Sequence, residues 1–89
     1  MISLIQIKKM TGYKLDLHFS DGSYGTLDFQ DILHAKTVLT IPLEDKEYFS
    51  AFFIDFGALC WKNGLEFSAE SLQLKLKEHE LLIIRKDVA

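Results

Sequence analysis

The sequence has few of the residues on which secreted, metal-binding and membrane-spanning proteins depend. Its 89 residues include one cysteine and one proline. The single cysteine, Cys60, cannot form an internal disulfide, and a metal site would need its other ligands from elsewhere. Apolar runs such as Leu81 to Ile84 are far shorter than the stretch of about 18 residues that crosses a membrane. The N-terminus lacks the basic region and cleavage site of a secretory signal. We therefore expect a soluble, cytoplasmic protein without membrane contact.

Positive charge is also scarce, because the formal net charge is -3. A protein that binds nucleic acid needs a clustered basic surface to neutralise phosphates. The densest basic stretch, Lys75 to Lys86, is interleaved with Glu78 and Glu80, as on an ordinary solvated face. We therefore expect no nucleic-acid binding by this chain alone.

The composition is that of a small globular domain. Hydrophobic residues make up 48% of the chain and aromatic residues 12%, unlike a disordered segment. Domains commonly run from about 50 to 250 residues. Residues 1–89 are therefore expected to form a single domain with a thin core.

The first third of the chain alternates apolar and polar residues, as antiparallel strands do. We predict a strand over residues 3–9, with Ile5 and Ile7 half-buried, and a second strand over Tyr13 to Phe19. The segment Ser20 to Ser23 contains an Asp-Gly pair, which favours a tight hairpin turn. Tyr24 to Phe29 is then the returning strand.

The middle of the chain shows weaker patterns. Gln30 to Thr40 has no sustained period and is predicted to hold one helical turn in a loop. Ile41 to Leu43 is predicted to be extended, because proline disfavours a helical conformation in the preceding residue. Glu44 to Phe49 is predicted as a short helix with Asp45 near its N-cap.

The last part of the chain predicts a second hairpin and a longer helix. Residues 51–56 and 58–62 flank Gly57 and are rich in residues that favour strands, and Asn63-Gly64 marks another turn. Ser68 is a good N-cap for a helix that extends to about residue 79. An apolar stripe on that helix is formed by Leu72, Leu76, His79 and Ile83. Leu81 to Ile84 is predicted as a continuation of the helix, a short buried strand or a partner-facing segment.

These elements predict an α+β fold. It consists of antiparallel β-hairpins, about five strands in all, packed with a short helix and a C-terminal helix.

No catalytic, metal-binding or cofactor-binding motif stands out. Asp16 and His18 lie two residues apart on one strand face, but a third metal ligand is missing, so we interpret them as solvated residues. Nothing places a histidine near Cys60, which we interpret as a small buried hydrophobe. We therefore predict no catalytic residues, no metal and no cofactor, although an enzyme whose site is completed between subunits through Asp16 and His18 stays an alternative.

The aromatic residues of the second half are the strongest signal. Six of them fall within a short stretch: Tyr48, Phe49, Phe52, Phe53, Phe56 and Trp61. A hairpin places alternate side chains on opposite faces. We do not expect a thin core to cover the aromatic side chains of both faces. Aromatic residues are enriched at protein interfaces. The candidate partner-binding residues are Phe52, Phe53, Phe56 and Trp61, and a homodimer is the first partner to expect.

Several motifs in order resemble one family. The stretch Tyr13 to Ser23 with its Phe-Ser-Asp-Gly hairpin, Leu27 to Phe29, Leu43 to Asp45, and the Trp-x-Asn-Gly turn at Trp61 to Gly64 resemble the bacterial domain of unknown function 2442. The resemblance covers about residues 3–76 and leaves 77–89 as a C-terminal extension. Lys62 replaces a usual proline, and Leu65-Glu66 replaces a common Ala-Asp pair.

The resemblance implies a small α+β domain with no catalytic residues. Some members are fused to a helix-turn-helix region, and many are encoded beside another small protein, which implies an antitoxin-like or regulatory role. Thirteen residues after Leu76 are too few for a helix-turn-helix module, so we expect a stand-alone member.

Two functional hypotheses follow besides the enzyme. The first is a protein-binding module that forms a homodimer or binds another small protein. The second is a sensor of a small ligand with polar contacts from Asp21, Asn63 and Glu66, which requires that the two turns open on the same edge.

Overall fold

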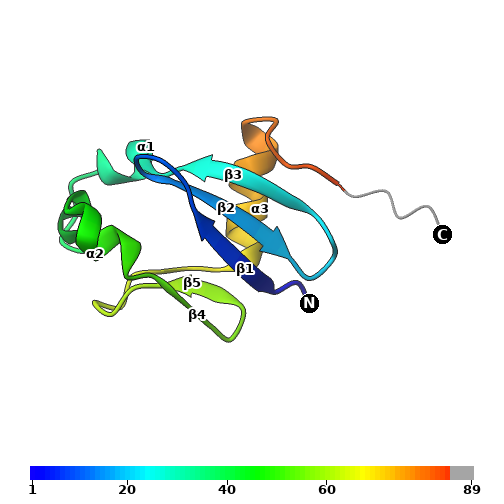
Figure 1. Cartoon of the computed structure of the whole chain (residues 1–89), viewed down its shortest axis with the longest axis horizontal. Coiled ribbons are helices and arrows are strands. Elements are labelled where there is room, and N and C mark those ends of the chain that lie inside the picture. Colours follow the sequence, from blue (N-terminus) through cyan, green and yellow to red (C-terminus); the bar gives the residue numbers. More distant parts are fainter. Residues whose placement is uncertain (85–89) are drawn as a thin grey trace.

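The computed structural model describes residues 1–84. The end of the predicted extension, residues 85–89, lies outside the described part. The predicted α+β class is confirmed, with two antiparallel sheets of three strands each and a C-terminal helix. The β4–β5–β6 sheet lies beside the N-terminal end of β1 (Figure 1).

The first sheet has the order β1–β2–β3 and comprises Leu4–Lys9, Lys14–Phe19 and Tyr24–Asp28. The alternation in β2 predicts its orientation correctly: Leu15, Leu17 and Phe19 are buried, whereas Asp16 and His18 are only partly covered. Residues 1–84 contain all three predicted strands, each within a residue or two of its expected bounds.

Strand β1 contains an irregularity that alternation could not reveal. The register against β2 shifts between Leu4 and Gln6, as in a β-bulge. Leu4 consequently takes the buried position opposite Phe19, and Ile5 is 61% exposed. The prediction that Ile5 shares a half-buried face with Ile7 is therefore wrong.

Helix α3, Ala69–Glu78, packs along one face of the first sheet (Figure 1). Ser68 caps it as predicted, because its hydroxyl oxygen accepts a hydrogen bond from the backbone N–H of Ser71 at 3.1 Å. The buried stripe is Ala69, Leu72, Gln73 and Leu76. His79 is the exposed C-cap and Ile83 lies beyond the helix, so the predicted stripe is correct only for Leu72 and Leu76.

The segment after α3 is neither a helix extension nor a buried strand. Glu80 has a φ of 58°, which ends the helix. Ile83 then exchanges two backbone hydrogen bonds with Tyr24 of β3, at 2.9 and 2.7 Å. Leu81, Ile83 and Ile84 are all at least 45% exposed.

Three short helical elements connect the two sheets: α1 (Gln30–Leu33), η1 (Ile41–Glu44) and α2 (Lys46–Ser50). The helical turn in α1 and the short helix α2 with Asp45 at its N-cap confirm the predictions for these segments. The prediction of an extended Ile41 to Leu43 is wrong. Pro42 lies in the first turn of a 3₁₀ helix, where backbone N–H groups have no partner within the helix, so the missing N–H of proline costs no hydrogen bond.

The second sheet has the order β4–β5–β6 and comprises Phe53–Asp55, Ala58–Cys60 and Glu66–Phe67. The predicted hairpin around Gly57 is present, although both strands are shorter than expected. Strand β6 was not predicted. It has two residues and forms because the Asn63-Gly64 turn folds the chain back onto β5.

One cluster of buried side chains includes residues from both sheets and from helices α2 and α3. Its largest members are Phe19, Phe29, Phe49 and Trp61. None of the helices within residues 1–84 has the length and apolar character that a membrane span requires.

Candidate functional site

The turn of the β4–β5 hairpin holds an aromatic residue in an unusual backbone conformation. Phe56 and Gly57 form the two-residue loop between Asp55 and Ala58, with φ values of 49° and 74°. Two successive positive φ values are typical of a type I′ turn, whose first position usually holds Asn, Asp or Gly. A bulky side chain there is strained. Phe56 is nevertheless 101% exposed, so no contact within the described chain offsets that strain.

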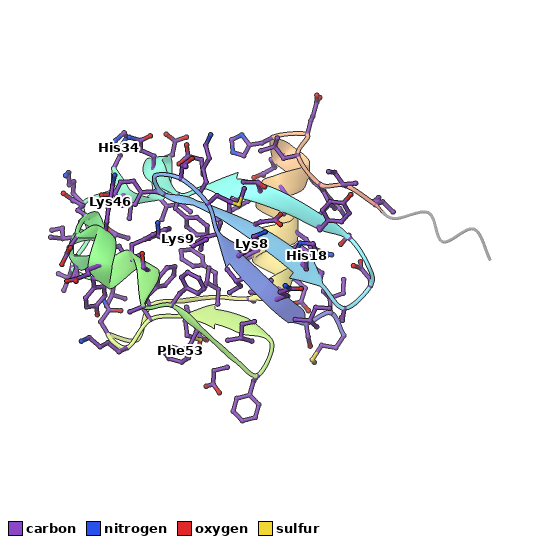
Figure 2. All side chains as sticks on the ribbon, viewed as in Figure 1. Lys8, Lys9, His18, His34, Lys46 and Phe53 are labelled. Atoms are coloured by element: carbon purple, nitrogen blue, oxygen red, sulfur yellow. The ribbon has the colours of Figure 1, made fainter. Side chains whose placement is uncertain are left out.

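The neighbouring residues extend the exposed apolar surface. Phe53 is 45% exposed and Ile54 is 39% exposed, and as successive residues of β4 they extend from opposite faces of the hairpin beside its open edge. We call Phe53, Ile54 and Phe56 the hairpin patch. Figure 2 shows Phe53 on the side of the hairpin that points away from the first sheet. Phe52, just before the patch, is half-buried and packs against the core.

The hairpin turn is held firmly against β1. The backbone N–H of Leu4 donates to the carbonyl oxygen of Gly57 at 2.8 Å. A methyl group added at Gly57 would lie 2.7 Å from the side chain of Ser3, so the turn fits closely against the N-terminal segment. The hairpin patch is therefore presented from a fixed position, which lowers the entropy cost of binding.

Cys60 lies on the outer side of the hairpin but is not a reactive site. It is 6% exposed and pairs with Phe53 across the hairpin. Burial raises the pKa of the Cys60 thiol above its ordinary value of 9.0, and the charges of Glu66 and Asp55 raise it further. The thiol stays protonated at neutral pH, and thiols react as nucleophiles in the thiolate form.

Trp61, a predicted partner-binding residue, lies in the core instead. It is 2% exposed, and its indole N–H donates to the carbonyl oxygen of Phe49 at 2.9 Å. Its ring makes T-shaped contacts with Phe29 and Phe67 at centroid distances of 6.2 Å. Trp61 therefore connects β5 to α2 within the fold and does not contribute to the hairpin patch.

Asp21, a predicted polar contact for a ligand, takes part in a hydrogen-bond network that docks α3. Its carboxylate accepts from the hydroxyl and the backbone N–H of Ser23, at 2.6 and 2.9 Å. The side-chain amide of Gln73 donates to Asp21 at 3.1 Å and to the Ser23 hydroxyl at 2.8 Å. These hydrogen bonds, that of the Ser23 hydroxyl above all, lower the pKa of Asp21 below its ordinary value of 3.8.

Sequence reasoning missed Gln73, which is only 7% exposed. A signal was present, because Gln73 shares the apolar stripe with Ala69, Leu72 and Leu76. A polar residue in such a stripe needs a partner, and Asp21 with Ser23 provides it.

The other two predicted polar contacts lie elsewhere. The amide of Asn63 donates to the carbonyl oxygen of Leu39 at 3.0 Å and accepts from the backbone N–H of Leu65 at 3.1 Å, so it organises two loops. Glu66 is exposed beside Cys60 and lines a shallow cavity of about 200 Å³ with Phe53. Asp21 and Asn63 do not line this cavity, so the three residues do not converge on one ligand site.

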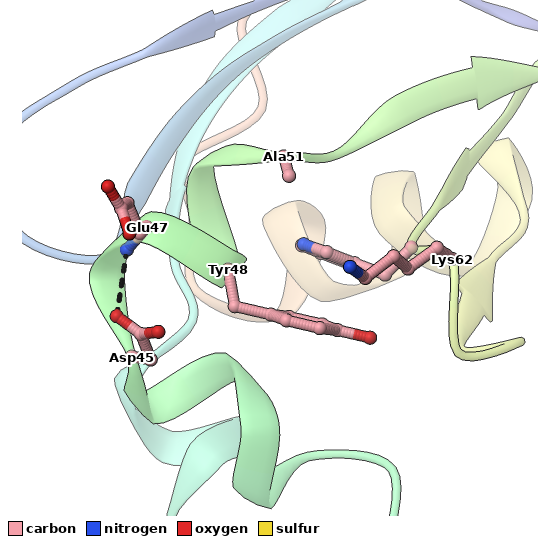
Figure 3. A pocket seen from close by; sticks show the side chains of 6 residues that line it. Asp45, Glu47, Tyr48, Ala51 and Lys62 are labelled. Atoms are coloured by element: carbon pink, nitrogen blue, oxygen red, sulfur yellow. Dashed lines mark hydrogen bonds between the residues drawn. The ribbon is translucent and has the colours of Figure 1, made fainter.

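A larger surface cavity of about 370 Å³ lies beside α2. Figure 3 shows the Lys62 side chain alongside the Tyr48 ring, and the ammonium nitrogen is 5.3 Å from the ring centroid. Asp45 is engaged as the N-cap of α2, accepting from the backbone N–H of Glu47 at 3.1 Å. The charged groups lining the cavity therefore already have structural partners or face solvent, and none of the predicted polar contacts lines it.

Asp16 and His18 lie together on the open face of the first sheet, as their spacing predicts. The His18 Nε2 and an Asp16 carboxylate oxygen are 2.9 Å apart, and the His18 ring stacks on Tyr24 at 5.2 Å. The Thr26 hydroxyl donates to the same carboxyl group at 3.3 Å. No cluster of three or more potential metal ligands is found among residues 1–84.

The comparison with known protein families identifies a family for the chain. A model for proteins of unknown function, DUF2442, matches residues 5–78. The chain belongs to this family. The expected resemblance over residues 3–76 is confirmed, with a shift of two residues at each end. No curated protein and no solved structure matches the chain. Membership in DUF2442 therefore shows that the chain is homologous to other members of this family, but it assigns no activity.

Proposed function

We propose that this DUF2442 protein is a protein-binding module that associates with a second copy of itself through the hairpin patch. The observation that carries the proposal is the fully exposed ring of Phe56 in a left-handed backbone conformation. An antitoxin-like or regulatory role toward another small protein would use the same surface, with a heterologous partner in place of the second copy.

The energetics of the turn support this proposal. A left-handed conformation costs a residue with a Cβ atom about 1–2 kcal/mol, and Asn would avoid much of that cost. Phe56 thus reduces the stability of the free chain while exposing a large apolar ring. Both costs are offset when the ring is buried in an interface, where large aromatic residues supply much of the binding free energy.

The size of the patch indicates a weak association. An aromatic side chain buries about 150–250 Å² when fully covered. Phe56 is fully exposed and Phe53 nearly half exposed, so the two rings offer on the order of 300 Å². A standard interface buries about 800 Å² on each partner. We therefore expect a reversible dimer that dissociates on dilution.

Sedimentation velocity over a concentration series tests the proposal. The wild-type protein should shift from monomer to dimer as concentration rises. Phe56→Asn should abolish that shift, and should not unfold the chain because Asn tolerates a positive φ. Val38→Asn is the matched control, since Val38 is 86% exposed outside the patch. A wild-type protein that stays monomeric at the highest soluble concentration, or an equal loss in both variants, contradicts the proposal.

The sensor and enzyme hypotheses lack comparable support. The three polar residues of the sensor hypothesis do not share a cavity. The enzyme hypothesis needs a third ligand beside Asp16 and His18, which no observation on residues 1–84 supplies.

A further inference from the structure

We propose that two copies associate edge to edge, with β4 of one copy pairing antiparallel to β4 of the other across a two-fold axis at Ile54. This inference rests on the proposed function and specifies its geometry. The dimer would join two sheets of three strands into one continuous sheet of six.

The edges of the two sheets differ in how they are protected. The outer edge of β3 is covered by Ile83, which exchanges two backbone hydrogen bonds with Tyr24. Strand β1 has a register irregularity near its start, where the backbone N–H of Leu4 is also hydrogen-bonded to the hairpin turn. The strand ends with two lysines, Lys8 and Lys9. Strand β6 has only two residues. Bulges, lysines, short strands and covering segments are the usual protections of sheet edges against pairing.

Strand β4 is also short, with three residues, and ends at the charged Asp55, but within the described residues no lysine, bulge or covering segment protects its open edge. It pairs only with β5, and all three of its residues are exposed. Two of the three, Phe53 and Ile54, are apolar. An exposed apolar edge strand is a template for another strand.

The register of the hairpin identifies the backbone groups that are free to pair. The N–H of Trp61 donates to the carbonyl oxygen of Leu65, so the backbone of Trp61 faces away from β4. Successive residues of a strand face opposite sides, so the backbone of Cys60 faces β4 and its partner Phe53 faces β5. The backbone N–H and C=O of Ile54 therefore point to the open edge.

The sequence of β4 suits pairing with itself. An antiparallel register centred on Ile54 places Ile54 opposite Ile54 of the second copy and Phe53 opposite Asp55. The carboxylates of the two Asp55 residues are then not directly opposite each other, so no like-charge pair opposes the contact. Phe56 follows the strand in the turn, so this register brings its exposed ring close to the start of β4 in the second copy.

A charge exchange at Ile54 tests this register in the full chain. Ile54→Lys and Ile54→Glu each place two like charges face to face, so each variant alone should raise the dimer dissociation constant at least about tenfold. An equimolar mixture should recover dimers, since the heterodimer pairs opposite charges. Ile54→Ala is the matched control, because it removes the side chain without adding charge. Its mixture with Ile54→Lys forms no pair of opposite charges, so it should recover less dimer than the Lys–Glu mixture. Sedimentation velocity measures the three variants and the two mixtures, and circular dichroism confirms that each variant is folded.

The possible outcomes separate the two proposals. Greater recovery in the Lys–Glu mixture than in the Lys–Ala mixture supports pairing of β4 across the two-fold axis. If Phe56→Asn abolishes a wild-type dimer but the Lys–Glu mixture recovers no more dimer than the Lys–Ala mixture, the edge-to-edge geometry is wrong and the proposed function stands. If the wild-type protein never associates, both proposals are wrong.

Discussion

Replacing Trp61 by phenylalanine should destabilise the fold strongly. Trp61 is the only tryptophan, is 2% exposed and donates its indole N–H to the carbonyl oxygen of Phe49. Trp61→Phe keeps an aromatic ring but removes that donor. A buried carbonyl oxygen that loses its partner costs about 1–3 kcal/mol.

The lost ring volume adds to this cost. Complete truncation of a buried aromatic residue to alanine costs about 3–5 kcal/mol, so the partial truncation accounts for about 1–2 kcal/mol. Together the two effects predict a loss of about 2–5 kcal/mol in the free energy of unfolding. For a chain of this length, each kcal/mol lowers the melting temperature by about 4–8 °C.

Urea denaturation followed by circular dichroism measures the effect, since the variant lacks the fluorescent tryptophan. The midpoint should fall at an unchanged m-value, because the change weakens packing without altering the surface exposed on unfolding. Phe56→Leu is the control, and we expect a change within about 0.5 kcal/mol for this fully exposed ring. A Trp61→Phe protein as stable as wild type would refute the assignment of Trp61 to the core.

Other regions give predictions of their own. The pKa of Asp21 is lower in the folded protein than its ordinary value of 3.8, so the ionised carboxylate stabilises the fold at pH values above 3.8. This contribution is lost as pH falls through the folded-state pKa. The difference in melting temperature between wild type and Asp21→Asn should therefore reach its full value near pH 6 and shrink below about pH 4. A difference that does not change with pH would contradict the hydrogen-bond network around Asp21. Gly25→Ala should lower the melting temperature clearly, because the added methyl would lie 2.6 Å from the carbonyl oxygen of Leu81; an unchanged value would mean that this segment moves aside at little cost. Cys60 should be alkylated far more slowly than free cysteine at pH 7 and rapidly in denaturant, and equal rates would show that the thiol is accessible.

The amphipathic strands and capped helices could be predicted because their signals are local. The alternation from Leu15 to Phe19 depends only on which face meets the core, and Ser68 caps α3 through a hydroxyl three residues from its partner. The Asp-Gly turn before Ser23 likewise determines its own geometry. Such features do not depend on distant parts of the chain.

The errors arise where tertiary contacts decide. Nothing in the alternation around Ile5 reveals the register shift that exposes it, because the shift belongs to the pairing of β1 with β2. The residue before Pro42 adopts a helical turn because proline only disfavours that conformation. In both segments the packing of the whole chain overrides the local conformational preference.

The candidate site could be predicted only as a group of aromatic residues. Trp61 and Phe56 are equally apolar in the sequence, yet one is buried and the other fully exposed. The structure separates them, because Phe56 occupies the turn at the tip of the hairpin while Trp61 faces the core. The sequence predicts Asn63 as a polar contact for a ligand, but its side-chain amide is hydrogen-bonded to Leu39 and Leu65.

A series of amide NMR spectra recorded at increasing protein concentration tests the central claim most directly. Self-association through the hairpin patch predicts concentration-dependent shifts that concentrate at residues 52–57 and leave the loop around Val38 unchanged. Shifts centred on β1 or on α3, or none at all, would contradict the claim that this hairpin is the binding surface of the protein.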